Sequence, residues 1–262
     1  MANYTKPVPA NMFPAVDYGK SISSGLIFCP SFSESFNTLR LFDASQKRAH
    51  GTFSGITADK WKMDDKKGVG KILSLRPYIS GGGIDITGLS SSSGNYTVAF
   101  YAAKDTTDGA FLDVLTGRIA LRSSTNALGV FFNGGWNVLE ADNSWTPDIW
   151  NVNVVTLDSV STKVKAYRDG IISASTPVPD YTAVNLGGTS SLFNYYDISS
   201  VSWAGSVAFF AIWERVLTID DIQSISVDPW QVFEVASIKT YPKAGAASQP
   251  AALGFSVGCG TI

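Results

Sequence analysis

The sequence predicts an all-β sandwich protein with one short helix near its C-terminal end. Its 262 residues are 45% hydrophobic, 12% aromatic and only 16% charged, a composition typical of well-packed β proteins. From residue 25 onward, short apolar or alternating runs follow one another, separated by Gly, Ser, Asn and Asp at the spacing of sandwich strands. One segment, residues 218–228, has the apolar periodicity of a helix instead.

The expected strands are joined by turns that the sequence marks. In the clearest hairpin, residues 163–172, Val164 and Ala166 alternate with polar or large side chains, and Asp169-Gly170 supplies the positive φ angles of a tight turn. Asn133-Gly134-Gly135 predicts a second hairpin turn. Other strands are expected at residues 25–28, 72–75, 96–101, 128–132, 136–141, 150–157 and 205–213, with a further one at 238–241.

The expected helix begins after Thr218, whose hydroxyl can cap it, and ends near Asp228-Pro229. Aspartates in its first turn favour the positive end of the helix dipole, and isoleucines at positions 219, 222 and 225 form one face. The chain divides into an N-terminal proline-containing arm (1–23), a body (24–234) and a tail rich in Ala, Gly and Ser (235–262). The small side chains of the tail bury little area against the entropy of ordering them.

Charge and hydropathy exclude several classes of function. A net charge of −2 offers no basic field for a nucleic acid, and no run reaches the ~18 apolar residues of a membrane span. The N-terminus lacks the basic start and apolar core of a signal peptide, so we expect a protein made in a cytoplasm. Cys29 and Cys259 are too few for a disulfide framework or a metal cluster, and we expect free thiols.

Four segments of the body carry a recurring pattern. They are an opening strand with Phe42-Asp43-Ala44-Ser45 and His50-Gly51-Thr52-Phe53, then residues 95–101, then residues 150–158 with Tyr167-Arg168-Asp169-Gly170, and finally residues 205–222. In this order they resemble the laminin-G-like branch of the concanavalin A-like jelly rolls. The resemblance covers residues 24–233 and implies two antiparallel sheets packed face to face in a jelly roll. The composition of the two ends adds extended arms to this body.

A shorter resemblance concerns the ends of the body. Gly19-Lys20-Ser21 and the exit Asp-Pro-Trp-Gln-Val-Phe at residues 228–233 are similar to laminin-G-like proteins encoded by tailed bacteriophages. It implies a virion component, such as a head decoration, fibre or tail-associated protein. Its partners would be other virion proteins or further copies of itself.

No catalytic residues are expected. Some concanavalin A-like jelly rolls are glycoside hydrolases that use paired carboxylates. The closest match to their spacing, Glu140-Ala141-Asp142, has Ser144 and Trp145 where the second glutamate is needed, so we interpret it as a solvated turn. His50 has no Ser or Cys nucleophile motif beside it, and we expect a loop or edge residue.

Calcium is the one metal that the resemblance suggests as a ligand, because many relatives bind it at the rim of the sandwich. Asp43 is the candidate ligand, since carboxylates and carbonyls on loops bind hard cations. The Gly-Asn-Gly positions of the family loop are here Gln46, Lys47 and Arg48, two of them cationic. We therefore favour a structure without calcium or another cofactor, in which Asp43 caps its own loop or pairs with a neighbouring cation.

Sugar binding requires an exposed aromatic ring beside amide or carboxylate groups. This composition occurs at Asn133, Trp136, Asn137, Asn143 and Trp145. Each such ring can instead fill the core, which is the favoured interpretation for a single ring and the one we expect for Trp150 and Trp213. Two functions follow as hypotheses: a non-enzymatic virion structural protein whose body contacts host-surface glycan, and a carbohydrate-binding adhesion module. Glycoside hydrolysis is a more distant third.

Overall fold

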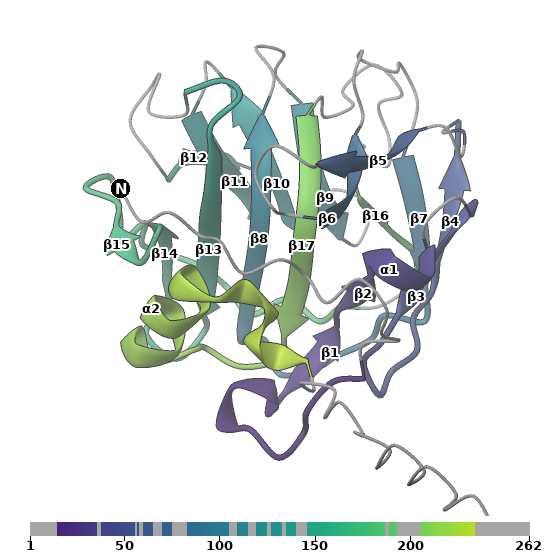
Figure 1. The fold of residues 1–262 in the computed structure, drawn as a ribbon. Coiled ribbons are helices and arrows are strands. Elements are labelled where there is room, and N and C mark those ends of the chain that lie inside the picture. The colour runs from purple at the N-terminus through teal and green to yellow at the C-terminus, as the bar shows by residue number, and fades with distance from the viewer. Residues whose placement is uncertain are drawn as a thin grey trace, which may run out of the picture.

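The computed structural model describes residues 15–35, 38–55, 57, 60–64, 70–74, 83–104, 109–114, 119–124, 127–132, 135–139, 146–186, 189–192 and 205–233. In these ranges the chain forms two antiparallel β-sheets stacked face to face, with one helix of more than a single turn (Figure 1). The predicted all-β, two-sheet jelly roll is confirmed. The expected strand at 238–241 and the tail lie outside the described residues.

The first sheet has eight strands, with β8, β13 and β17 at its centre. In spatial order they are β15 (Ile171–Ile172), β14 (Lys163–Arg168), β13 (Trp150–Asp158), β8 (Tyr96–Lys104), β17 (Gly205–Trp213), β6 (Gly70–Ser74) and β5 (Trp61–Asp64), and β1 (Leu26–Phe28) also pairs with β17. The predicted hairpin turn between β14 and β15 is confirmed, with φ angles of 49° at Asp169 and 81° at Gly170.

The second sheet has nine strands and lies behind the first in Figure 1. In order they are β12 (Gly135–Val138), β11 (Ala127–Phe132), β10 (Ile119–Ser124), β9 (Gly109–Val114), β16 (Thr189–Leu192), β7 (Gly83–Thr87), β4 (Gly51–Ser54), β3 (Arg40–Asp43) and β2 (Pro30–Ser31). The predicted hairpin after Phe132 is confirmed, because this residue pairs with Gly135.

The predicted helix is α2 (Ile219–Val227), and Thr218 caps it as expected. The Thr218 Oγ1 accepts the Asp221 N–H at 3.2 Å, while an Asp221 carboxylate oxygen accepts the Thr218 N–H at 3.3 Å. This reciprocal pair satisfies two backbone donors at the start of the helix. The remaining helical segments are single turns: α1 (Phe32–Ser35), η1 (Ser21–Ser23) and η3 (Pro229–Val232). Within the described ranges, no helix has the length and hydropathy needed to cross a membrane.

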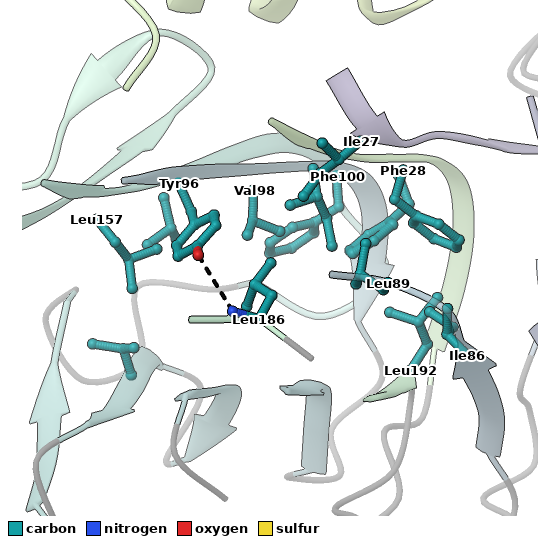
Figure 2. Close-up of a cluster of buried hydrophobic side chains, with 14 of the residues drawn as sticks. Ile27, Phe28, Ile86, Leu89, Tyr96, Val98, Phe100, Leu157, Leu186 and Leu192 are labelled. Atoms are coloured by element: carbon teal, nitrogen blue, oxygen red, sulfur yellow. Dashed lines mark hydrogen bonds between the residues drawn. The ribbon is translucent and has the colours of Figure 1, made fainter. Parts of the chain in front are cut away.

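The core between the sheets is formed by alternate residues of the central strands. On β8, Tyr96, Val98 and Phe100 face the second sheet and are almost completely buried (Figure 2). The Tyr96 hydroxyl accepts the Leu186 N–H at 3.3 Å and donates to the Ser91 carbonyl at 3.2 Å. The one polar atom of this buried ring is thereby satisfied, as burial requires.

A glycine lets two strands of the second sheet pack closely. A Cβ atom at Gly51 would lie 2.5 Å from the Ile84 Cγ2 and 3.2 Å from the Leu41 Cβ. Both neighbours are completely buried, so neither has free space to move into. The His50-Gly51-Thr52 segment therefore needs its glycine for packing between β3 and β7.

The outer face of the first sheet carries a second apolar layer. Helix α2 and the turns η1 and η3 cover part of this face, toward the bottom of the sheet in Figure 1. Trp213 is completely buried, as expected, but in this outer layer and not between the two sheets, and its Nε1–H donates to the Ile22 carbonyl at 2.7 Å. Strand β17 is buried along its whole length, which agrees with the unbroken apolar run of residues 207–213.

The first and last described segments of the body lie side by side and form what we call the terminal clasp (Val16, Asp17, Lys20, Val232 and Phe233). Val16 forms a bridge with Phe233, and the Asp17 N–H donates to the Val232 carbonyl at 2.9 Å. The Lys20 Nζ donates to the carbonyls of Gln231 at 2.7 Å and Phe233 at 3.2 Å. The chain therefore enters and leaves the described body at one place.

Candidate functional site

Asp43 is a structural residue of the loop that follows β3. Its carboxylate is completely buried and accepts the N–H groups of Cys29, Ser45 and Ala49 at 2.8–2.9 Å, together with the Ser45 hydroxyl at 2.7 Å. These donors belong to the β1–β2 connection and to both ends of the loop. The expected loop-capping role of Asp43 is confirmed, and all four bonds would compete with a calcium ion for the same oxygens.

The neighbouring groups support the same loop. The His50 Nδ1 accepts the Asp43 N–H at 3.0 Å, which confirms a loop position for the histidine. Cys29 is a free, completely buried thiol, as expected. Burial, followed by the negative charge of Asp43, raises the pKa of the Cys29 thiol well above its ordinary value, so the thiol stays protonated and unreactive. Cys259 lies outside the described residues.

The predicted sugar-binding residues lie only partly within the described ranges. The residues outside them are Asn133, Asn143 and Trp145, and the Glu140-Ala141-Asp142 segment is also outside. The backbones of Trp136 and Asn137 lie on β12, where they pair with Phe131 and Val130 of β11. Asn137 is half-buried.

The described flanks of the two predicted sugar-binding loops lie near opposite ends of the sandwich. Phe132, before the hairpin, packs edge to face on Tyr181, whose hydroxyl donates to the Gly94 carbonyl just before β8 begins. Asp148, after the second loop, donates its N–H to the carbonyl of Lys104, where β8 ends. The nine residues of β8 span about 25 Å, so the structure does not bring these flanks together.

A different aromatic surface lies on the outer face of the first sheet. We call it the aromatic shelf: Tyr101 on β8, Trp150 on β13 and Trp230 on η3, packed around Ala208 of β17. The three rings are half-buried, whereas Ala208 beneath them is completely buried. Trp150 was expected in the core, and that expectation is wrong, because its side chain belongs to this outer surface.

Sheet geometry explains how the shelf arises. Tyr101 pairs with Val152, so Trp150 lies two residues along the same face, as a diagonal neighbour of Tyr101. Their ring centroids are 5.0 Å apart with the planes tilted by 46°. The register of β17 shifts between Val207 and Phe209, which places Ala208 in a β-bulge under the rings.

The third ring is held by the exit from the helix. The Asp228 carboxylate accepts the Trp230 N–H at 3.2 Å and so caps η3. The Trp230 ring packs on Phe209 with centroids 5.6 Å apart and planes at 90°. Trp230 belongs to the exit segment of residues 228–233, and its ring extends the shelf.

An exposed polar pair lies at the turn between β14 and β15. The Asn151 Nδ2 donates to the Asp169 Oδ2 at 2.7 Å, and the other Asp169 oxygen accepts the Val152 N–H at 2.9 Å. Asn151 follows Trp150 on β13, so by strand alternation the two side chains lie on opposite faces of the strand. Half-exposed rings such as those of the shelf are typical of a sugar-binding surface.

Sequence reasoning also missed a polar end of the inter-sheet core. Lys104 and Asn153 are completely buried, and by strand alternation they share the inner face with Phe100. The Arg168 Nε donates to the Asn153 Oδ1 at 3.4 Å. A buried lysine needs polar partners. The burial of Lys104 therefore indicates polar surroundings at this end of β8, which the sequence of the strand does not predict.

Among the residues that the structure describes, no group of three or more His, Cys, Asp or Glu side chains could hold a metal ion.

Comparisons with known proteins agree with the jelly-roll architecture. The family profile described as the concanavalin A-like lectin/glucanases superfamily matches residues 80–223. No curated protein matches the sequence.

Solved structures similar to this chain include binding domains of botulinum neurotoxins. The receptor-binding domain of the C/D mosaic serotype has a TM-score of 0.58 at 15% identity, over 78% of this chain and 51% of that chain. The binding domain of serotype D has a TM-score of 0.58 at 16% identity, over 79% and 52%. The binding domain of neurotoxin DC in complex with rat synaptotagmin II has a TM-score of 0.58 at 13% identity, over 79% and 52%. The present chain thus spans about half the length of these domains, and the likeness concerns the fold.

Proposed function

This chain belongs to the concanavalin A-like lectin/glucanases superfamily, and on that basis we propose that its body is a non-enzymatic glycan-binding module. The observation that carries the proposal is the aromatic shelf of Tyr101, Trp150 and Trp230. Rings stack on the apolar faces of sugars, and amides and carboxylates bind sugar hydroxyls.

Binding is favoured over hydrolysis by how three of the described carboxylates are used. Asp43, Asp158 and Asp169 each accept backbone N–H groups and so hold a loop or turn in place. A glycosidase would instead need two carboxyl groups facing one sugar bond. We therefore propose recognition without bond cleavage, with cell-surface glycan as the partner.

The test is a glycan array with the purified full chain, with and without EDTA, followed by titration of the best binder. We expect Trp150→Ala to lower affinity by roughly 1–3 kcal/mol, the range of other aromatic stacking platforms. Ile171→Ala is the matched control, because Ile171 is 74% exposed on the edge strand β15. A silent array would contradict the proposal.

Two further results would relocate the site. Loss of affinity with Trp145→Ala, and not with Trp150→Ala, would place the glycan on the predicted loop that also carries Asn143. Loss of binding in EDTA would show a calcium requirement, for which Asp43 is the sequence candidate. If Trp150→Ala lowers the affinity and neither of these results is seen, the shelf remains the site.

We also propose that the protein is a structural component of a tailed-phage virion, as a head decoration, fibre or tail-associated protein. The terminal clasp supports this, because residues 1–14 and 234–262 both connect to the body at one place. Arms that start together can engage neighbouring subunits while the body projects away from them. Deletion of residues 235–262 should abolish incorporation into particles and leave the melting temperature unchanged; normal incorporation would count against this role.

A further inference from the structure

Basic side chains gather near the β2 end of the nine-stranded sheet. Arg40 lies on β3, Lys47 and Arg48 lie on the loop between β3 and β4, and all three side chains are exposed. None of the carboxylates that the structure describes forms an ion pair with them. We call this group the basic edge (Arg40, Lys47 and Arg48). It keeps an unbalanced positive charge, although the whole chain carries a net charge of −2.

The side chain of Arg40 is held in place by an aromatic ring. Its Cζ lies 5.4 Å from the centroid of the Phe42 ring, in a cation–π contact. The Phe42 ring packs edge to face on His50 with centroids 5.7 Å apart, and the His50 Nδ1 accepts the Asp43 N–H at 3.0 Å. The guanidinium of Arg40 is therefore partly ordered before a ligand arrives, which lowers the entropy cost of binding one.

Arg48 has a backbone conformation that is unusual for a long side chain. Its φ angle is 52°, in the left-handed region that glycine and asparagine adopt most easily. Such strain in a non-glycine residue occurs preferentially at sites with a function. The Arg48 Nη1 lies 3.5 Å from the Asp43 carbonyl oxygen, so the guanidinium lies beside β3. Arg40 and Asp43 are three residues apart on this strand, about 10 Å, and one short anionic segment can therefore reach both arginines.

We propose that the basic edge binds the oxyanion groups, sulfate or carboxylate, of an acidic polysaccharide. Arginine binds such groups through two parallel N–H···O bonds, and lysine adds a mobile point charge. The positive region is short, because Thr52 pairs with Arg40 on one side and with Asp85 on the other, which places an acidic residue two strands from Arg40. Separate charges along a polysaccharide fit so short a region, whereas a nucleic acid presents a continuous row of phosphates.

The basic edge and the aromatic shelf belong to different sheets. Leu41 is completely buried between the sheets, so Arg40 beside it on β3 faces the opposite way, on the outer face of the nine-stranded sheet. The shelf lies on the outer face of the eight-stranded sheet. Binding at the basic edge therefore does not rest on the proposed use of the shelf, and Trp150→Ala should leave it unchanged.

The test is a calorimetric titration of the full chain with dextran sulfate and with hexagalacturonate, which carry sulfate and carboxylate groups. We expect the double variant Lys47→Gln and Arg48→Gln to weaken binding of at least one of them about tenfold, because two charge-assisted contacts are lost. The double variant Lys163→Gln and Lys165→Gln is the matched control, since it removes the same charge from β14 of the other sheet. Binding of only one ligand would identify the oxyanion as sulfate or carboxylate.

Arg40→Lys tests the geometry of the site apart from its charge. The substitution keeps the positive charge and loses the planar guanidinium, so we expect a several-fold weaker affinity for the acidic ligand. Unchanged affinity would contradict recognition through this guanidinium. Arg40 is exposed, so this variant should keep the fold even where the Lys47→Gln, Arg48→Gln variant does not, which circular dichroism checks. Raising the NaCl concentration should weaken binding, since salt screens exposed charges.

Three outcomes would overturn the proposal. The first is no binding of dextran sulfate or hexagalacturonate. The second is an equal loss of affinity in the two double variants, which would show that only the net charge matters. The third is a DNA duplex that binds as tightly as the acidic polysaccharide and loses affinity in the Lys47→Gln, Arg48→Gln variant, which would show a general polyanion surface. An array that binds no neutral glycan, with acidic ligands still bound at the basic edge, would count against the shelf alone.

Discussion

The two faces of the eight-stranded sheet bury their side chains by different means. The inner face packs on a second sheet, so Val98, Phe100 and Phe210 are buried by shape and apolar area alone. The outer face is covered by short segments that are held through directed hydrogen bonds, such as that from Trp213 to the Ile22 carbonyl. A face covered piecewise leaves part of its aromatic surface available for a partner, and the shelf lies in that part.

The largest expected effect is on the inner face. Phe210 is completely buried and packs edge to face on Phe28, with ring centroids 5.8 Å apart. Phe210→Ala should lower the free energy of unfolding by about 3–5 kcal/mol, because it leaves a cavity between two rigid sheets. Urea unfolding followed by circular dichroism measures this. A loss below ~1 kcal/mol would mean that the inner face repacks freely around the smaller side chain. The proposed difference between a rigidly packed inner face and a partly covered outer face would then be wrong.

Asp43 joins the two layers, since Cys29 packs in the outer layer and Ala49 in the inner one. Asp43→Asn replaces one acceptor oxygen with an amide donor that faces other donors. We expect a loss of about 2–4 kcal/mol in the same urea measurement. Asp17→Asn is the control, since its carboxylate is partly exposed. Equal stability of the two variants would contradict the assigned role of Asp43.

On the outer face, Trp213→Phe removes one hydrogen bond while keeping a large ring. The Ile22 carbonyl then loses its Nε1–H partner, and we expect a loss of about 1–2 kcal/mol. Hydrogen exchange should show increased opening of residues 21–24, with β8 and β13 unchanged. Faster exchange throughout β8 would show that the outer cover is not a separate layer.

The smallest effect concerns a turn that belongs to neither face. The Ser161 hydroxyl donates to Asp158, and with the N–H groups of Ser161 and Val160 it holds the pKa of this carboxyl below its ordinary value of 3.8. The resulting stability is present above about pH 4 and is lost as the pH falls through the lowered pKa. Asp158→Asn should therefore weaken the fall of the melting temperature as the pH is lowered from 5 to 3. If the melting temperature of the variant depends on pH as strongly as that of the unsubstituted chain, this assignment is contradicted.

Much of the architecture follows from local rules that the sequence displays. The Asp169-Gly170 turn, the Thr218 cap and the alternation of β14 were predictable, because each depends on residues within a few positions of one another. The position of Trp150 was not, since a tryptophan at the start of an apolar strand is equally compatible with either face of a sheet. The buried Lys104 was also missed, because its burial depends on the loops and strands packed around the end of β8.

The sequence by itself determined several of the strands, the helix at residues 219–227 and the tight turns, and it favoured a loop role for Asp43, because the backbone preferences and side-chain periodicity behind them act over short distances. Only the tertiary structure decided that Trp213 is covered while Trp150 and Trp230 remain half-exposed. That distinction depends on a bulge at Ala208 and on segments such as Ile22, which contacts β17 across about 190 residues of chain. Apolar side chains are driven out of water wherever a cover exists, and the fold determines where the cover ends.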